Sequence, residues 1–288
     1  MIGLILKGYQ IVEKIKDGSV GTVWKATKNN QTYALKILAE KHLAHAGKVR
    51  QFKKEATLTQ RMAHPNIVKV YEYLDHRPGP FFAMEYFESE NLKYAMWHRP
   101  ERVYKYEFKI LRQAADALRT IHSAGVVHKD VKPENLLVDA RAEVRLIDFS
   151  LGQTKMDRLL QFGRRVEGTP LYMAPEQIRG EKCDPRTDIY AFGVLVYELL
   201  TKRPPFLGTT EHAILEKHLK EPPLSMRSHV KTLAPELDAL ICRMLGKRRD
   251  DRFQDMGEVL YELAKWEKKD TVMRLRQVEP AKPKEIGR

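Results

Sequence analysis

The run VVHKDVKPENLLV at residues 126–138 is followed closely by VRLIDFSLG at residues 144–152. Within these two largely apolar runs the chain places two carboxylates, an amine and an amide. Carboxylate and amide oxygens are ligands that Mg²⁺ prefers, and an amine can neutralise the charge of a phosphate. Phosphoryl transfer asks a protein mainly for in-line positioning and charge neutralisation, so the two runs predict a phosphoryl-transfer site. The four side chains are Asp130 as proton acceptor, Lys132 as phosphate contact, and Asn135 and Asp148 as metal ligands.

The composition is typical of a globular protein with a sizeable core. Of the 288 residues, 43% are hydrophobic and 31% charged, which is enough material for one large domain or two lobes. The two cysteines, Cys183 and Cys242, show no metal-ligand spacing, so we expect two reduced thiols. The apolar start at residues 1–10 is too short for a signal-peptide core, and the apolar run at residues 189–200 is shorter than the ~20 residues of a membrane span. We therefore expect a cytoplasmic chain without a membrane segment.

The formal net charge of +13 raises the question of nucleic-acid binding. The cations are spread along the whole chain, and they concentrate only at residues 246–252 and in the Lys/Pro-containing segment after Trp266. A basic, solvated surface explains this distribution better than a dedicated binding site. Nucleic acid is therefore not an expected partner.

The order of the expected secondary structure indicates an α+β fold. Residues before Asn91 are mostly short runs rich in β-branched and aromatic side chains, and helical spacing appears among them only at residues 48–62. Later residues are mostly helical, and the nearly all-apolar run at residues 187–202 predicts a helix buried in a large core. A small sheet-rich lobe followed by a larger helical lobe fits this order. The expected strands lie at residues 9–15, 20–27, 32–38, 67–74 and 80–87, and the other helices at residues 107–125, 236–245 and 253–266.

A glycine-containing turn and a lysine precede the two opening runs. In IKDGSVGTV, residues 15–23, Gly18 and Gly21 would let backbone N–H groups approach a phosphate, although such hairpin turns are common. Lys36 lies inside an apolar strand and must either be paired or face a cleft. Glu55, on the following helix, could hold Lys36 toward an anion. The alternative is a snorkelling lysine and a solvated glutamate.

Together these segments resemble the eukaryotic-like (Hanks-type) serine/threonine protein kinase family over about residues 8–266. Seven motifs follow one another in the family's order and with compatible spacing. The compact length and the run HPNIVKVYEY resemble the bacterial members of the family. The motifs are GSVGTV at residues 18–23, YALK at 33–36, HKDVKPEN at 128–135, DFS at 148–150, GTPLYMAPE at 168–176, TDIYAFG at 187–193 and RRDDRF at 248–253.

The resemblance implies a bilobal kinase fold and a role for each matching residue. Lys36 would contact the α- and β-phosphates of ATP and pair with Glu55, and Asp130 would be the catalytic base. Glu176 and Arg252 would form a buried ion pair that braces the lower lobe. The implied nucleotide site consists of the loop residues Gly18, Ser19 and Gly21, of Ile15, Val23, Ala34, Met84 and Leu137 around the adenine, with Met84 as gatekeeper, and of the backbone of Glu85 and Phe87.

The resemblance also implies the reaction, the cofactors and the partners. Lys132, together with Thr169, is typical of the serine/threonine branch, which implies a transferase that phosphorylates protein substrates in signalling. ATP and Mg²⁺ are the implied cofactors, with Mn²⁺ as an alternative metal, and autophosphorylation and dimerisation are compatible with the family. The implied division is a kinase N-lobe at residues 1–87, a C-lobe at residues 88–266 and a basic Lys/Pro-containing tail at residues 267–288.

Four positions depart from the family pattern. Lys16 stands where the first glycine of the loop is usual, and Thr59 replaces a large apolar residue that normally packs against Phe149. The lost apolar contact would cost about 1–2 kcal/mol of order in the active arrangement. Ser150 replaces the glycine of DFG and resists positive φ, so we expect a shifted balance of segment positions and not a dead enzyme. Lys129 replaces an arginine, which keeps the charge but loses the bidentate fork.

The activation segment, residues 153–170, offers Thr154 and then no phosphorylatable side chain until Thr169. Arg165 stands about where a phosphoacceptor is expected. We therefore hypothesise that phosphorylation at the usual place does not switch this chain on. Two other functions stay open, namely a pseudokinase that acts as a nucleotide-binding scaffold or regulatory module, and a small-molecule phosphotransferase. The GTPLYMAPE segment disfavours the second, because small-molecule relatives generally lack this peptide-docking element.

Overall fold

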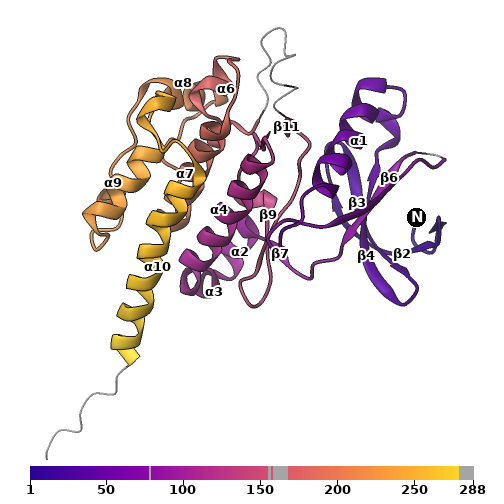
Figure 1. Cartoon of the computed structure of the whole chain (residues 1–288), viewed down its shortest axis with the longest axis horizontal. Helices are drawn as coiled ribbons and strands as arrows, with labels where there is room; N and C mark the ends of the chain where they lie inside the picture. Colours follow the sequence, from indigo (N-terminus) through magenta and orange to yellow (C-terminus); the bar gives the residue numbers. More distant parts are fainter. Residues whose placement is uncertain (78, 155–156, 158–167, 279–288) are drawn as a thin grey trace, which may run out of the picture.

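The computed structural model describes residues 1–77, 79–154, 157 and 168–278. A curled antiparallel sheet with one flanking helix forms the N-terminal part, and helices dominate the C-terminal part (Figure 1). This arrangement confirms the predicted α+β, bilobal architecture. Arg165, which the sequence places near the usual phosphoacceptor position, lies outside the described residues.

Six strands form the N-terminal sheet in the order β1-β2-β3-β4-β6-β5, and every neighbouring pair is antiparallel. Asn29 and Asn30 join β3 to β4 with positive φ at both positions, as a type I′ hairpin turn requires. Tyr9, Leu35 and Phe81 belong to the apolar cluster of this sheet. The strands are β1 (Ile5–Leu6), β2 (Tyr9–Asp17), β3 (Gly21–Lys28), β4 (Gln31–Leu38), β5 (Val70–Leu74) and β6 (Phe81–Glu85).

Helix α1 (Ala46–Gln60) packs against the sheet through a second apolar cluster. Phe52 and Ala56 of the helix meet Val70 and Phe82 of the strands, and all four side chains are buried. Because residues four apart lie on one face of a helix, Phe52 and Ala56 present a single apolar stripe to the sheet. This docking carries the rest of the helix, Glu55 included, to the edge of the large cleft described below.

The core of the C-terminal part forms around α7 (Pro185–Thr201), which is buried along almost its whole length. The Asp184 side chain caps its first turn, Pro185 occupies the first helical position, and Lys202 ends it in the left-handed conformation with φ of 61°. Helix α10 packs along α4 on another side of this core (Figure 1). The other helices are α2 (Leu92–His98), α3 (Pro100–Lys105), α4 (Glu107–Ser123), α6 (Pro175–Ile178), α8 (Glu211–Lys220), α9 (Pro235–Met244) and α10 (Met256–Val278).

Short strands at the junction of the two parts fix the loops that carry the polar motifs. β9 (Leu136–Val138) pairs with β10 (Val144–Leu146) and with β7 (Glu90–Asn91), and β8 (Val126–Val127) pairs with β11 (Gln153–Thr154). The segment from His128 to Asn135 therefore starts at one small sheet and ends at the other. The segment that begins at Asp148 is bounded in the same way, because it runs from β10 to β11.

Both ends of the chain contain more secondary structure than the sequence predicted. Residues 1–6, which belong to the N-lobe predicted at residues 1–87, add β1 to the edge of the sheet, with Leu6 buried in its core. Helix α10 continues past Trp266 to Val278, within the predicted tail at residues 267–288. Among the described residues, no helix is long and apolar enough to cross a membrane.

Candidate active site

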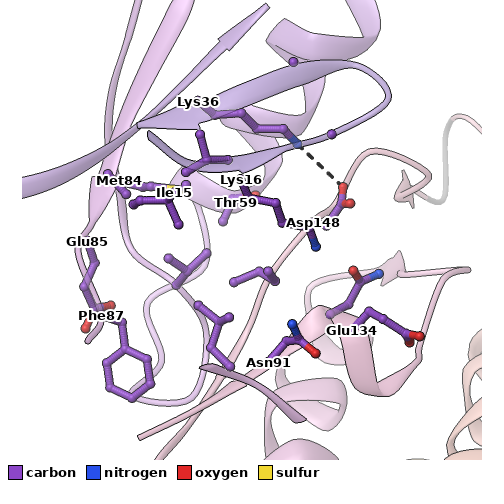
Figure 2. Close-up of a pocket in the computed structure, with 18 of the residues that line it drawn as sticks. Ile15, Lys16, Lys36, Thr59, Met84, Glu85, Phe87, Asn91, Glu134 and Asp148 are labelled. Atoms are coloured by element: carbon purple, nitrogen blue, oxygen red, sulfur yellow. Dashed lines mark ion pairs between the residues drawn. The ribbon is translucent and has the colours of Figure 1, made fainter. Parts of the chain in front are cut away.

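A cleft of about 620 Å³ opens between the sheet and the helical part. Figure 2 shows side chains from both parts pointing into it. Strands β2 to β4 and β6 form its upper wall, and Leu137 of β9 and the segment that follows β10 form its floor. The structure brings all residues predicted for the nucleotide site to this cleft, namely Ile15, Gly18, Ser19, Gly21, Val23, Ala34, Lys36, Met84, Glu85, Phe87 and Leu137.

The glycine-containing turn is fixed by close backbone packing. The amide of Gly18 donates to the carbonyl of Gly21 at 2.9 Å. A Cβ added at Gly21 would lie 2.2 Å from the carbonyl oxygen of Ile37, so only glycine fits beside β4 at this position. Lys16, which replaces the first glycine of the motif, lies on β2 opposite Val23 and also lines the cleft.

Lys36 reaches from β4 toward two carboxylates. Its Nζ lies 2.5 Å from Glu55 Oε1 and 3.7 Å from Asp148 Oδ1, and the second contact is drawn in Figure 2. Burial alone would lower the pKa of Lys36, but the two negative charges outweigh burial and raise it. Lys36 is therefore charged at neutral pH and pairs with Glu55 of α1, as the sequence predicted.

Asp148 adopts a constrained backbone that aims its carboxylate at the cleft. It takes a positive φ of 65°, which a residue with a Cβ rarely adopts, whereas Ser150 does not take positive φ. In this conformation Ser150 therefore needs no positive φ, and the expected shift in the balance of segment positions stays a prediction. Burial would raise the pKa of Asp148, but the charge of Lys36 and hydrogen bonds from Ser150 lower it to about 2. The side chain is consequently ionised and able to hold a cation.

Asp130 lies beside the cleft at the centre of a hydrogen-bond network. The Asn135 side-chain amide donates to the Asp130 carbonyl at 2.8 Å and to its Oδ2 at 3.0 Å. Lys132 Nζ lies 2.7 Å from Asp130 Oδ2 and also donates to the Thr169 hydroxyl at 2.7 Å. That hydroxyl donates to Asp130 Oδ1 at 3.0 Å. The carboxylate is held from both sides, and the structure brings four of the predicted residues together here.

A buried aspartate that the sequence reading did not single out holds this loop. Both Asp188 oxygens accept backbone amides, from His128 and Lys129, each at 2.8 Å. The ring of His122 lies 2.8 Å from the same carboxylate. Lys129 has φ of 71°, and its carbonyl accepts a hydrogen bond from Gln177 at 2.9 Å. These bonds hold the positive φ of Lys129, which is a strained backbone conformation. They thereby orient the side chain of Asp130, the next residue.

A second group that the sequence reading missed holds β6, a strand that lines the cleft. The Arg145 guanidinium on β10 bonds both carboxylate oxygens of Glu85 at 3.1 and 3.2 Å. It also lies 4.4 Å from the centre of the Phe87 ring. Planar guanidinium groups suit both bidentate carboxylate binding and stacking on a ring. Arg145 therefore links β10, which pairs with β9 of the cleft floor, to Glu85 and Phe87. These are the two residues whose backbone groups, by the family resemblance, would contact the purine.

The predicted ion pair of the lower lobe is present and buried. Arg252 bonds both oxygens of Glu176 at 2.8 and 2.9 Å, and neither side chain is more than 2% exposed. Burial would raise the pKa of Glu176, but its hydrogen bonds with Arg252 and Thr187 contribute to lowering it. The pair joins α6, which follows the GTPLYM segment, to the loop before α10.

The oxygen donors of Asn135 and Asp148 in the cleft fit a hard divalent cation. Asn135 and Asp148 both line the cleft, and the Asp148 carboxylate is ionised at neutral pH. Among the described residues no group of three or more His, Cys, Asp or Glu side chains gathers as a protein-only metal site. A donor set of one carboxylate and one amide matches Mg²⁺, which usually keeps water and takes substrate phosphates as further ligands.

The family model of the protein kinase domain matches residues 9–262. The chain belongs to the protein kinase family. Its curated relatives confirm the Hanks-type serine/threonine resemblance that the motifs indicated. This kinase is 31% identical over 275 residues to a probable serine/threonine-protein kinase of Clostridium perfringens, a match that covers 94% of the chain and 40% of that protein.

Two further relatives come from other bacteria. Serine/threonine-protein kinase pkn3 of Myxococcus xanthus is 34% identical over 261 residues, covering 85% of this kinase and 47% of the relative. Serine/threonine-protein kinase PknB of Mycolicibacterium smegmatis is 32% identical over 219 residues, covering 74% and 35%. The chain thus spans less than half the length of the curated relatives it matches.

Proposed function

We propose that this kinase transfers the γ-phosphoryl group of ATP to serine and threonine hydroxyls of protein substrates. The observation that carries the proposal is the Asp130 carboxylate, held by Asn135, Lys132 and Thr169 beside a cleft that also contains Lys36 and Asp148. Each of these groups has a separate task in phosphoryl transfer. The names of the relatives add support, because they are serine/threonine kinases.

The nucleotide would lie with its adenine under the sheet and its phosphates toward Lys36. The charged amine of Lys36, fixed by Glu55, would neutralise the α- and β-phosphates. Arg145 would keep Glu85 and Phe87 in place, so that their backbone groups meet the purine edge. The apolar side chains around the adenine would be Ile15, Val23, Ala34, Met84 and Leu137.

Asn135 and Asp148 would hold Mg²⁺, with Mn²⁺ as the alternative. When bound, the metal supplies positive charge that offsets the charge of the β- and γ-phosphates. The lowered pKa of Asp148 keeps its oxygens free of protons over the neutral range. The amide of Asn135 donates to Asp130, which leaves its oxygen free to face a cation.

In the reaction, the substrate hydroxyl oxygen would form a bond to the γ-phosphorus while the bond to the β–γ bridging oxygen breaks, releasing ADP. The hydroxyl proton would pass to Asp130, whose carboxylate orients the nucleophile in line. Lys132 would neutralise charge on the transferred group. Thr169 bonds both Asp130 and Lys132, and it therefore sets the distance between base and cation.

The first test is transfer of label from γ-labelled ATP with Mg²⁺, with and without a generic basic protein. Asp130→Asn and Lys36→Met should each lower the rate at least about 100-fold, because each removes a group that acts on the reacting atoms. Lys41→Met, at an exposed lysine outside the cleft, is the charge-matched control and should keep its activity. Melting temperatures of all variants report whether they are folded.

The label should appear on serine or threonine, which acid hydrolysis of the product distinguishes from tyrosine. No transfer by the unaltered protein, combined with nucleotide-dependent thermal stabilisation, would replace this proposal with a pseudokinase scaffold. Transfer to a small molecule but to no protein would instead indicate a small-molecule phosphotransferase.

A further inference from the structure

Helix α1 contacts the activation segment through an ion pair next to Glu55. Lys54 Nζ lies 2.9 Å from Asp157 Oδ2, and each side chain is a little more than one third exposed. Lys54 directly precedes Glu55, so any force on its side chain acts on the turn of α1 that carries the partner of Lys36. No motif of the family that we recognised in the sequence includes Lys54 or Asp157.

Asp157 is held in place by its own segment. Its Oδ2 accepts the Thr154 amide at 2.7 Å and the Thr154 hydroxyl at 2.6 Å, and its own amide donates back to that hydroxyl at 3.2 Å. This reciprocal pattern of hydrogen bonds holds the Asp157 carboxylate in place independently of Lys54. Burial would raise the pKa of Asp157, but the bonds from Thr154 and Lys54 outweigh burial and lower it. The Asp157 carboxylate is therefore negatively charged at neutral pH.

Thr154 connects the same carboxylate to the catalytic loop. It belongs to β11, where it pairs with Val126 of β8, and β8 runs directly into the loop that contains Asp130. A second contact lies one turn earlier on α1, where the Gln51 side-chain amide donates to the Ser150 carbonyl at 3.0 Å. Polar contacts thus form a continuous path from the catalytic loop to α1.

On the inner face of α1, a threonine reduces the apolar packing that would hold the helix in place. Thr59 is buried where the family has a larger apolar residue, and its hydroxyl only donates back to the Glu55 carbonyl at 2.8 Å. Leu58 lies in the same apolar cluster as Phe149 and supplies part of the missing packing. The ion pair between Lys54 and Asp157, on another face of α1, can offset the apolar packing that is lost at Thr59.

We propose that Asp157 is a positioning residue, a fixed carboxylate that holds α1, and with it the Lys36–Glu55 pair, in the arrangement needed for transfer. It accounts for a segment with no phosphorylatable side chain between Thr154 and Thr169, because a charge that is always present needs no kinase to add it. The inference rests on the proposed function for its effect on turnover, but the contact with α1 exists independently of catalysis.

The experiment compares Asp157→Asn and Lys54→Met with the unaltered kinase. Asparagine keeps the bond from Thr154 and removes the charge, and methionine keeps the length of lysine. Lys53→Met is the matched control, because Lys53 is the adjacent lysine on α1 and lies 5.4 Å from the Tyr73 ring. The first readout is amide exchange of residues 46–60 without nucleotide. The second is kcat and KM for ATP.

A partly exposed pair of this kind shifts an equilibrium by about two- to fivefold. We expect protection of α1 and kcat both to fall by about this factor in Asp157→Asn and Lys54→Met, with KM for ATP changed less than kcat. The double variant should be no worse than either single variant, since both remove one interaction. Lys53→Met should match the unaltered kinase in both readouts.

Unchanged exchange and unchanged kcat in Lys54→Met would overturn the proposal, and so would an equal loss in Lys53→Met. If the unaltered kinase transfers no phosphate, the exchange readout still decides whether Asp157 holds α1, so failure of the proposed function is told apart from failure of this inference. Thr154→Ala should cause a partial loss through its cap. Complete loss would show that phosphorylation of Thr154 is required and would also overturn the proposal.

Discussion

Ser150 is a clear departure of this kinase from its family pattern, and in the structure it affects the charge of Asp148. Asp148 carries the positive φ of this turn, and hydrogen bonds from Ser150 help to lower the Asp148 pKa to about 2. The family's glycine offers conformational freedom that the observed backbone does not use. The backbone amide of Ser150 donates to Asp148 Oδ1 at 3.3 Å, and the serine side chain lowers the pKa of Asp148 further.

We predict that Ser150→Ala and Ser150→Gly both lower activity, by up to about tenfold, because each removes the serine side chain that helps to lower the pKa of Asp148. The measurement is kcat as a function of Mg²⁺ concentration, and the half-saturating concentration should rise in both variants. The comparison separates two explanations, since only glycine restores backbone freedom. A gain of activity in Ser150→Gly without a gain in Ser150→Ala would show that serine restrains the backbone after all.

At the scale of single residues, the sequence predicted the polar side chains in and beside the cleft. It missed the residues that hold those side chains and their loops in position. Lys36 and Asp148 could be found because a charged residue in an apolar run is costly unless it is paired, and Glu55 could be found as a carboxylate on the helix that follows Lys36. Asp188 also lies in a nearly apolar run and could have been found in the same way, but we interpreted that run only as a buried helix. The partners of Lys54 and Arg145 lie about 100 and 60 residues away, so no local pattern could reveal them.

Among the elements, α6 is too short to be stable alone and relies on its buried ion pair. It has only four residues, Pro175–Ile178, and Glu176 in its first turn is bonded by Arg252 and by the Thr187 hydroxyl. Arg252 also donates to the carbonyls of Gly246 and Arg186. One guanidinium therefore joins α6, the start of α7 and the loop after α9.

We predict that Arg252→Met destabilises the fold by about 3–5 kcal/mol, because it leaves Glu176 buried without its counter-ion. Arg248→Met, at an exposed arginine four residues earlier, should change stability by less than about 0.5 kcal/mol. The free energy of unfolding in urea measures both variants. Similar losses in the two would mean that the buried pair adds nothing beyond general charge.

The elements also show why their boundaries were harder to predict than their existence. The five expected strands of the sheet and the long helices are present because their periodicity extends over many residues. β1 has two residues and exists only because β2 offers an open edge and the core accepts Leu6. The charge-rich residues after Trp266 predicted a tail, but a helix already formed propagates more easily than a new one starts, and α10 continues to Val278.

Across the whole molecule, α8 is joined to the central helix α7 through a histidine that cannot easily be charged. His218 of α8 is fully buried, and its Nδ1 lies 2.9 Å from the hydroxyl of Tyr190 on α7. The ring of Phe206 lies 4.8 Å from the imidazole. Burial and the nearby charge of Lys247 lower the pKa of His218 to about 3. The docking of α8 thus depends on a neutral imidazole.

This pKa predicts how stability depends on pH. In the unfolded chain a histidine takes up a proton near pH 6.5, whereas the folded protein excludes that proton down to about pH 3. Between these values the unfolded state binds more protons, so the free energy of unfolding falls as pH decreases. The contribution of one such group is about 1.4 kcal/mol for each pH unit. The stability that neutral His218 provides is complete above pH 6.5 and is lost toward pH 3.

We predict that His218→Gln reduces the slope of unfolding free energy against pH by about 1.4 kcal/mol per unit between pH 6.5 and pH 4.5. The glutamine variant should be less stable than the unaltered kinase at pH 8 and should approach it as pH falls, because only the histidine must exclude a proton. His212→Gln is the control, since His212 is exposed on the same helix, and its slope should equal that of the unaltered kinase. Urea unfolding at five pH values measures all three. An undiminished slope in His218→Gln would show that the loss of stability in acid arises from the carboxylates and that the contact of α8 with α7 is insensitive to pH.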